Sequence, residues 1–246
     1  MSKHFVREIE KLNARIIRLG EQVEAQLDAA IIAVAEYDVA KAGKVIAGDL
    51  AVDQAEVEIE EECLKLLALY QPVARDLRLI VVVLKMTNDL ERVGDHASRI
   101  ATFTRELSEL PRIDIPKALF ELSKQAKLMF RKSLLSLVEQ DMTLAEAVLL
   151  GDDTVDSLNK ALFAWLLENL GRDGLDNKSL LLINSVARRL ERIGDHASNI
   201  AEDVVYLLSG NIIRHGSEID QKLRLGGEPR QRSGPESAGD ADAGAN

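Results

Sequence analysis

The chain carries one twelve-residue phrase twice, with the copies one hundred residues apart. "LERVGDHASRIA" covers residues 90–101 and "LERIGDHASNIA" covers residues 190–201, and ten of the twelve positions are identical. A second pair of related phrases lies upstream of each copy, "DLAVD" at 49–53 and "DDTVD" at 152–156. Solenoid repeats have periods of about 20–50 residues, so a period near one hundred indicates two copies of a whole domain.

Helical periodicity extends over most of the chain, and aromatic residues make up only 4% of it, which favours packed helices over sheets. "LPRIDIP", at 110–116, holds two prolines and no helical pattern, so it is predicted to be the linker between the halves. We therefore expect an all-α fold of two pseudo-symmetric three-helix bundles. The six long antiparallel helices are expected at about 3–37, 38–69, 72–109, 116–140, 141–170 and 178–209.

The predicted domains are a first repeat at 1–110, a second at 111–225 and a disordered tail at 226–246. The tail is expected because "GGEPRQRSGPESAGDADAGAN" lacks aromatic and large aliphatic residues. The segment at 210–224 is ambiguous, because its isoleucines and leucine are also compatible with a short docking helix.

Composition excludes several classes of protein. A net charge of −10 argues against general binding to a nucleic acid backbone, which needs a basic surface. The single cysteine, Cys63, excludes an internal disulfide and a cysteine-rich zinc site, and its apolar neighbours predict a packed core residue. The most apolar run, residues 77–86, is far shorter than the roughly 20 residues of a membrane span. We expect a soluble, cytoplasmic protein that reaches a membrane only through partners.

On a helical wheel, the repeated phrase has a core face with a glycine at its edge. A glycine inside a helix costs about 1 kcal/mol relative to alanine. Its recurrence predicts that Gly94 and Gly194 are points of close approach to a ligand or to another backbone. The residues expected on the core face of the first copy are Leu90, Val93, Ala97, Ile100 and Ala101.

Each copy also places two acids four residues apart, a spacing that costs an isolated helix about 0.2–0.5 kcal/mol. This acidic stripe continues a line of apolar residues, so it is expected to face a neighbouring helix. The middle helix of each half carries a second acidic pair. Four carboxylates in one place need either basic side chains or cations, and an all-oxygen set favours Mg²⁺, Ca²⁺, Mn²⁺ or iron. The predicted metal ligands are Asp49, Asp53, Glu91, Asp95, Asp152, Asp156, Glu191 and Asp195.

The simplest alternative is a solvated acidic face in which Asp95 pairs with Arg99, four residues later. Asn199 replaces this arginine in the second copy, which counts against that explanation. His96 and His196 lie on the other flank of the core face and are expected to be interface residues or supports for the acids rather than ligands. Asp89 extends the first acidic set, whereas the matching position in the second half is an arginine.

These residues resemble the PhoU family, the accessory and regulatory proteins of bacterial phosphate-specific transport. The resemblance is carried by "QPVARDLRLIVVVLKMTNDLERVGDHASRIA", at 71–101, and "RRLERIGDHASNIAEDVVYLLSG", at 188–210. It implies two three-helix bundles, a homodimer and a cytoplasmic, non-enzymatic adaptor. It also implies multinuclear iron or zinc, or another divalent ion such as magnesium or manganese, on the acidic pairs named above.

The function that the resemblance implies is negative regulation of phosphate uptake and of the phosphate-starvation regulon when phosphate is plentiful. The expected partners are the ATPase subunit of the phosphate ABC transporter and a sensor histidine kinase. Two alternatives remain: a metal-free helical adaptor for another transporter, and a metal-dependent phosphoryl-transfer enzyme. No phosphate-binding loop, nucleophile elbow or zinc-protease motif supports the enzyme.

Overall fold

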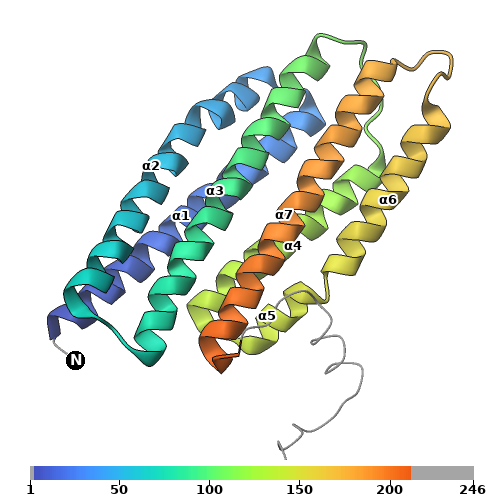
Figure 1. Cartoon of the computed structure of the whole chain (residues 1–246). Helices are drawn as coiled ribbons and strands as arrows, with labels where there is room; N and C mark the ends of the chain where they lie inside the picture. The colour runs from blue at the N-terminus through green and yellow to red at the C-terminus, as the bar shows by residue number, and fades with distance from the viewer. Residues whose placement is uncertain (1–2, 212–246) are drawn as a thin grey trace, which may run out of the picture. The chain divides into compact units, whose positions relative to one another are not determined.

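A computed structural model describes residues 3–211, which form helices and connecting segments without a strand (Figure 1). The all-α class and the two bundles predicted from the sequence are confirmed. The fifth expected helix is interrupted and forms two shorter ones. The helices are α1 (Lys3–Glu36), α2 (Val39–Tyr70), α3 (Ala74–Ser108), α4 (Lys117–Glu139), α5 (Met142–Leu149), α6 (Asp152–Asn169) and α7 (Asn177–Ser209).

Aspartates cap three of the helix starts. Asp38, the predicted N-cap of α2, accepts a hydrogen bond from the Lys41 backbone N–H at 2.8 Å. Asp141 accepts one from Thr143 N–H at 2.7 Å, and Asp176 does the same for Ser179 at 2.7 Å. Each carboxylate satisfies a backbone donor that the first turn leaves without an intrahelical partner.

The break between α5 and α6 lies at Gly151. A Cβ at this position would be 3.1 Å from the Val148 carbonyl oxygen and 3.2 Å from Cγ of Met129 on α4. The backbone therefore passes close to α4, and glycine is itself a poor residue inside a helix. The sequence periodicity alone did not indicate this interruption.

The two bundles meet along α3 and α7, which lie side by side, while α2 and α6 lie on opposite outer sides (Figure 1). The core face predicted for the repeated phrase is fully buried on α3. Cys63 is also buried, as predicted, and burial raises the pKa of its thiol to about 12. It is therefore a neutral core residue near neutral pH.

The predicted linker connects α3 to α4 without helix and is held against α1. The Tyr37 hydroxyl donates to the Ile113 carbonyl at 3.0 Å, and the Arg112 guanidinium lies over the Tyr37 ring at 4.8 Å. Within residues 3–211, no helix combines the length and the apolar character that crossing a bilayer requires. The expected tail at 226–246 and the ambiguous segment after Asn211 lie outside the described residues, and the domain limits 1–110 and 111–225 remain predictions.

Candidate functional site

The first acidic set consists of four carboxylates from two facing helices. Asp49 and Asp53 come from α2, and Glu91 and Asp95 come from α3. Burial raises the pKa of Asp49, and the charges of Asp95 and Asp53 raise it further. Burial also raises the pKa of Glu91, again with contributions from Asp95 and Asp53. The four carboxylates are therefore close enough to repel one another, as the sequence predicted for facing pairs.

The second acidic set repeats this arrangement, with Asp152 and Asp156 on α6 and Glu191 and Asp195 on α7. Burial raises the pKa of Asp152, and the charges of Asp195 and Asp156 add to the effect. The pKa of Glu191 is raised by burial and by the same two aspartates. The same pairs of positions interact in both halves, so the duplication extends to the electrostatics.

An exposed arginine of the repeated phrase contacts the first acidic set. Arg92 Nη1 lies 3.5 Å from Asp95 Oδ2, and its Nε lies 3.5 Å from Glu91 Oε2. In the salt-bridge alternative the partner of Asp95 is Arg99, but among residues 3–211 the two form no ion pair. Arg92 lies three residues before Asp95, which is also a neighbouring position on a helix.

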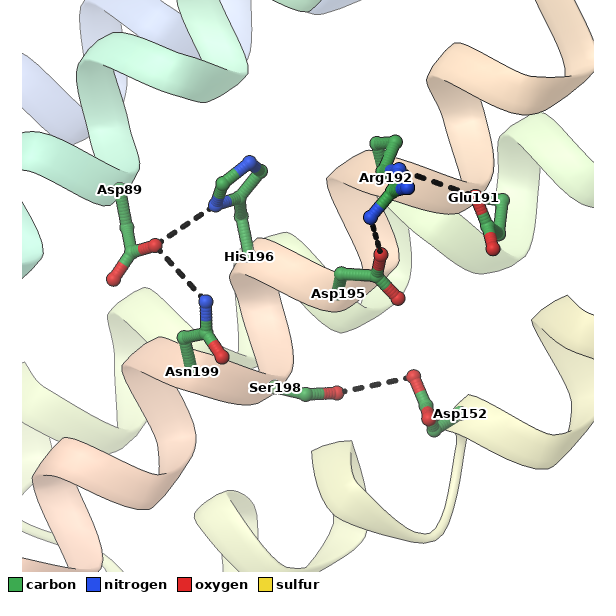
Figure 2. Close-up of polar contacts among 8 residues, drawn as sticks. All are labelled: Asp89, Asp152, Glu191, Arg192, Asp195, His196, Ser198 and Asn199. Carbon is green, nitrogen blue, oxygen red and sulfur yellow. Dashed lines mark hydrogen bonds and ion pairs between the residues drawn. The ribbon is translucent and has the colours of Figure 1, made fainter. Parts of the chain in front are cut away.

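The second half contains the same arginine bridge, drawn in Figure 2. Arg192 Nη1 lies 3.2 Å from Asp195 Oδ2, and its Nε lies 3.9 Å from Glu191 Oε2. Asn199 therefore removes no ion pair from this half. The replacement of Arg99 by Asn199 is no evidence against a salt-bridge explanation, and that part of the sequence interpretation was wrong.

A serine in the repeated phrase also belongs to each site, although it is absent from the predicted set of residues. Ser198 Oγ donates to Asp152 Oδ1 at 3.2 Å (Figure 2). The hydroxyl of its counterpart, Ser98, acts against the increase in the pKa of the Asp49 carboxyl. The available signal was position, because Ser98 lies three residues after Asp95 and on the same face of α3.

The carboxylate oxygens of the two sites suit a hard divalent cation, but the side chains are not placed to hold such a cation. Asp49 Oδ1 is buried without a hydrogen-bond partner, and every predicted ligand offers carboxylate oxygen. Yet among residues 3–211 no three His, Cys, Asp or Glu side chains are placed to hold a metal ion. Arg92 and Arg192 supply the positive charge in this arrangement.

The two histidines of the repeated phrase lie at the contact between α3 and α7, as the interface prediction expected. The His96 and His196 rings are 5.4 Å apart between centroids. Asp89 does not extend the first acidic set; instead its Oδ1 lies 2.8 Å from His196 Nδ1 and 3.2 Å from Asn199 Nδ2 (Figure 2). Burial, followed by the charges of His196 and Arg189, lowers the pKa of His96 to about 4.

Both glycines of the phrase are points of close approach, but the neighbour is a valine side chain and not the ligand or backbone that the sequence predicted. A Cβ at Gly94 would lie 3.2 Å from Cγ1 of Val52 on α2. A Cβ at Gly194 would lie 3.2 Å from Cγ1 of Val155 on α6. The glycines therefore bring each acid-bearing helix close to the middle helix that carries the facing acids.

Comparison with known proteins gives the family. The model of the PhoU domain matches the chain twice, at residues 16–104 and 119–204. A phosphate-specific transport system accessory protein PhoU homolog from Aquifex aeolicus is 38% identical, over 85% of this chain and 95% of the relative. The protein of the same name from Clostridium acetobutylicum is 35% identical, over the same shares of the two chains.

Solved structures agree with this result. The crystal structure of PhoU from Pseudomonas aeruginosa is similar with a TM-score of 0.79 and 36% identity, covering 84% of this chain and all of that one. The phosphate transport system regulatory protein PhoU from Streptococcus pneumoniae gives a TM-score of 0.80 at 27% identity, with 86% of this chain and all of that one covered.

Proposed function

Since this chain belongs to the PhoU family, we propose that it is an accessory and regulatory protein of phosphate transport. It acts as a negative regulator of phosphate uptake and of the phosphate-starvation regulon when phosphate is plentiful. The observation that carries the proposal is the double match to the PhoU domain, with an acid pair on both facing helices of each repeat.

We further propose that the acidic sets bind divalent or multinuclear metal, such as iron, zinc, magnesium or manganese. A bound cation would supply positive charge that offsets carboxylate repulsion and ties the two facing helices of each half together. Support comes from the raised pKa values of these carboxyls and from the unpartnered Asp49 oxygen. The ligands would be Asp49, Asp53, Glu91 and Asp95 in the first half, and Asp152, Asp156, Glu191 and Asp195 in the second.

One observation favours a second candidate, a metal-free helical adaptor. The guanidinium groups of Arg92 and Arg192 contact the α3 and α7 acids in matching ways, so charge balance is partly available without a cation. The two candidates differ in a simple measurement, because only the first loses stability when a chelator is added.

The proposed role is that of an adaptor rather than an enzyme. Its partners are the ATPase subunit of the phosphate ABC transporter and a sensor histidine kinase, and the protein acts as a cytoplasmic homodimer. The names of the relatives support the link to the transport system, since each is called an accessory protein of phosphate-specific transport.

A deletion strain tests the regulatory role. With phosphate in excess, the strain is expected to produce alkaline phosphatase constitutively, and restoring the gene is expected to repress it. A deletion strain that still represses alkaline phosphatase in rich phosphate contradicts the proposal. Purification with each tagged partner then separates contact with the ATPase from contact with the kinase.

A further inference from the structure

The outer surface of α2 carries a line of exposed apolar side chains. Leu50, Val57 and Leu64 are spaced seven residues apart and are 64%, 50% and 54% exposed. α2 lies at the outer side of the first bundle (Figure 1), while its inner surface packs through other residues, among them Val52 and Ile59. A seven-residue spacing puts the three side chains on one narrow stripe, the pattern by which one helix packs against another.

The second half shows that a middle helix of this fold does not need such a stripe. α6 is matched to α2 by the valines that contact the two glycines, Val52 and Val155. With that register, the positions of Leu50 and Val57 are taken by Asp153 and Lys160. Of the three corresponding positions on α6, only that of Leu64 is also apolar. It is occupied by Leu167, which is 58% exposed. The complete line is therefore a property of the first half.

Glutamates border the line on both sides. On a helical wheel, Glu60 lies on one side and Glu58 and Glu61 lie on the other. Arg15 approaches Glu58 at 3.7 Å, while within residues 3–211 neither Glu60 nor Glu61 forms an ion pair. An exposed lysine, Lys65, lies on the same side as Glu58 and Glu61 and is 3.6 Å from Glu62.

This acidic border is also specific to α2. The positions of Glu58, Glu60 and Glu61 are taken on α6 by Ala161, Phe163 and Ala164. A second copy of the chain docked through α2 would place glutamates beside glutamates at the same interface. The charges therefore favour an occupant of the opposite sign.

We propose that the outer surface of α2 binds an amphipathic helix of a partner protein, with an apolar stripe bordered by lysine or arginine. Leu50, Val57 and Leu64 pack against the stripe, and Glu60 and Glu61 pair with the basic borders. The proposal requires neither a bound metal nor the regulatory role, because it is argued from the exposed side chains of α2 alone.

Two synthetic helical peptides test the proposal on the full chain. Both have leucine at the a and d positions of three heptads; one has lysine and its twin has glutamate at e and g. Fluorescence anisotropy should show binding of the basic peptide at micromolar concentration, and binding of the acidic twin at least about tenfold weaker. Equal binding of the two peptides, or none of either, overturns the proposal.

A matched pair of variants locates the surface. Leu64→Gln and Leu167→Gln are the same neutral substitution at matching positions of nearly equal exposure. Leu64→Gln should weaken binding of the basic peptide at least about tenfold, and Leu167→Gln should leave it within about twofold. Glu60→Gln with Glu61→Gln should also weaken it.

Three outcomes would reject this surface. If the two leucine variants behave alike, the peptide binds the acidic chain nonspecifically. If Leu64→Gln instead lowers the mass of the chain in analytical ultracentrifugation, the occupant is a second copy. If the glutamate variant binds the basic peptide as well as the unmodified chain does, the acidic border plays no part in recognition.

Discussion

Gly94 on α3 lies against Val52 on α2 so closely that a Cβ at the glycine would be 3.2 Å from Cγ1 of the valine. Gly194 and Val155 repeat this contact at the same distance in the second half. The two contacts set how near each middle helix lies to the helix that carries the repeated acids. Since the acids flank these contacts in the sequence, close packing and carboxylate crowding come from the same phrase.

Alanine at Gly94 is expected to gain less stability than alanine at Gly43. Both are helical glycines, and replacing glycine by alanine inside a helix gains about 1 kcal/mol. Gly43 has nothing within 4 Å of its Cβ position, whereas Gly94 has the fully buried Val52. Overpacking costs about 1–3 kcal/mol.

Urea unfolding of the two variants measures the difference. Gly94→Ala should lie at least about 1 kcal/mol below Gly43→Ala in free energy of unfolding. Equal gains at the two positions would show that Val52 moves aside freely and that the contact does not limit helix spacing.

Neutralising one acid in each half should stabilise the metal-free protein at pH 7. Burial raises the pKa of Asp49 and Asp152 above the ordinary 3.8, so folding favours their protonated form. The stability that these groups contribute is complete below the ordinary pKa and is lost as the pH rises through the raised, folded-state pKa.

The double variant Asp49→Asn/Asp152→Asn is therefore expected to exceed the unmodified chain in stability at pH 7 in chelator, with the advantage shrinking toward pH 4. Thermal melts across this range give the comparison. An advantage that is constant with pH, or that grows as the pH falls, disagrees with the direction of the pKa shifts.

Removing the two bridging arginines should have opposite effects on stability and on metal binding. Arg92 and Arg192 are exposed, and exposed ion pairs contribute about 0–1 kcal/mol. Arg92→Gln/Arg192→Gln should therefore lower the metal-free stability only slightly. Because a competing positive charge is lost, titration with Mn²⁺ should show several-fold tighter binding. Weaker Mn²⁺ binding in the variant would mean that the arginines do not compete with metal.

Asp89 is expected to stabilise the contact between α3 and α7. Asp89→Ala removes the acceptor that His196 and Asn199 share, at a cost of about 1–2 kcal/mol. Arg189→Ala is the matched control, since Arg189 occupies the same position in the other repeat and its side chain forms no hydrogen bond or ion pair within residues 3–211. Chemical denaturation should show a loss for Asp89→Ala and a change within about 0.5 kcal/mol for Arg189→Ala. Equal losses of unfolding free energy in the two variants would show that the Asp89 contacts do not stabilise the fold.

Periodicity and internal duplication were sufficient to predict the bundles, the core face of the repeated phrase and the facing acids. They also identified Gly94 and Gly194, because a glycine that recurs in a helix needs a physical reason. What they missed depends on side-chain reach and on tertiary contact. The bridge from Arg92 is one example, because this exposed arginine has a side chain long enough to reach Asp95.

Asp89 was grouped with the nearby acids because sequence distance cannot show that α7 lies beside it. The interruption at Gly151 depends on the approach to Met129, a contact between α4 and the segment joining α5 to α6. The positions of Ser98 and Ser198 are predictable from the sequence, since each lies three residues after an acid and on the same helix face.

The most direct test of metal binding by the acidic sets combines metal analysis of the purified chain with thermal melts before and after chelator. Asp95→Asn/Asp195→Asn removes one proposed ligand from each half, and Glu10→Gln/Glu121→Gln makes the same charge change on exposed helix surface. The unmodified chain and the control should contain divalent metal and lose several degrees of Tm in chelator, since about 1 kcal/mol corresponds to 2–4 °C at this size. The Asp95/Asp195 variant should contain less metal and shift less. An unmodified chain that contains no metal and melts at the same temperature in chelator would contradict metal binding and favour the arginine-balanced adaptor.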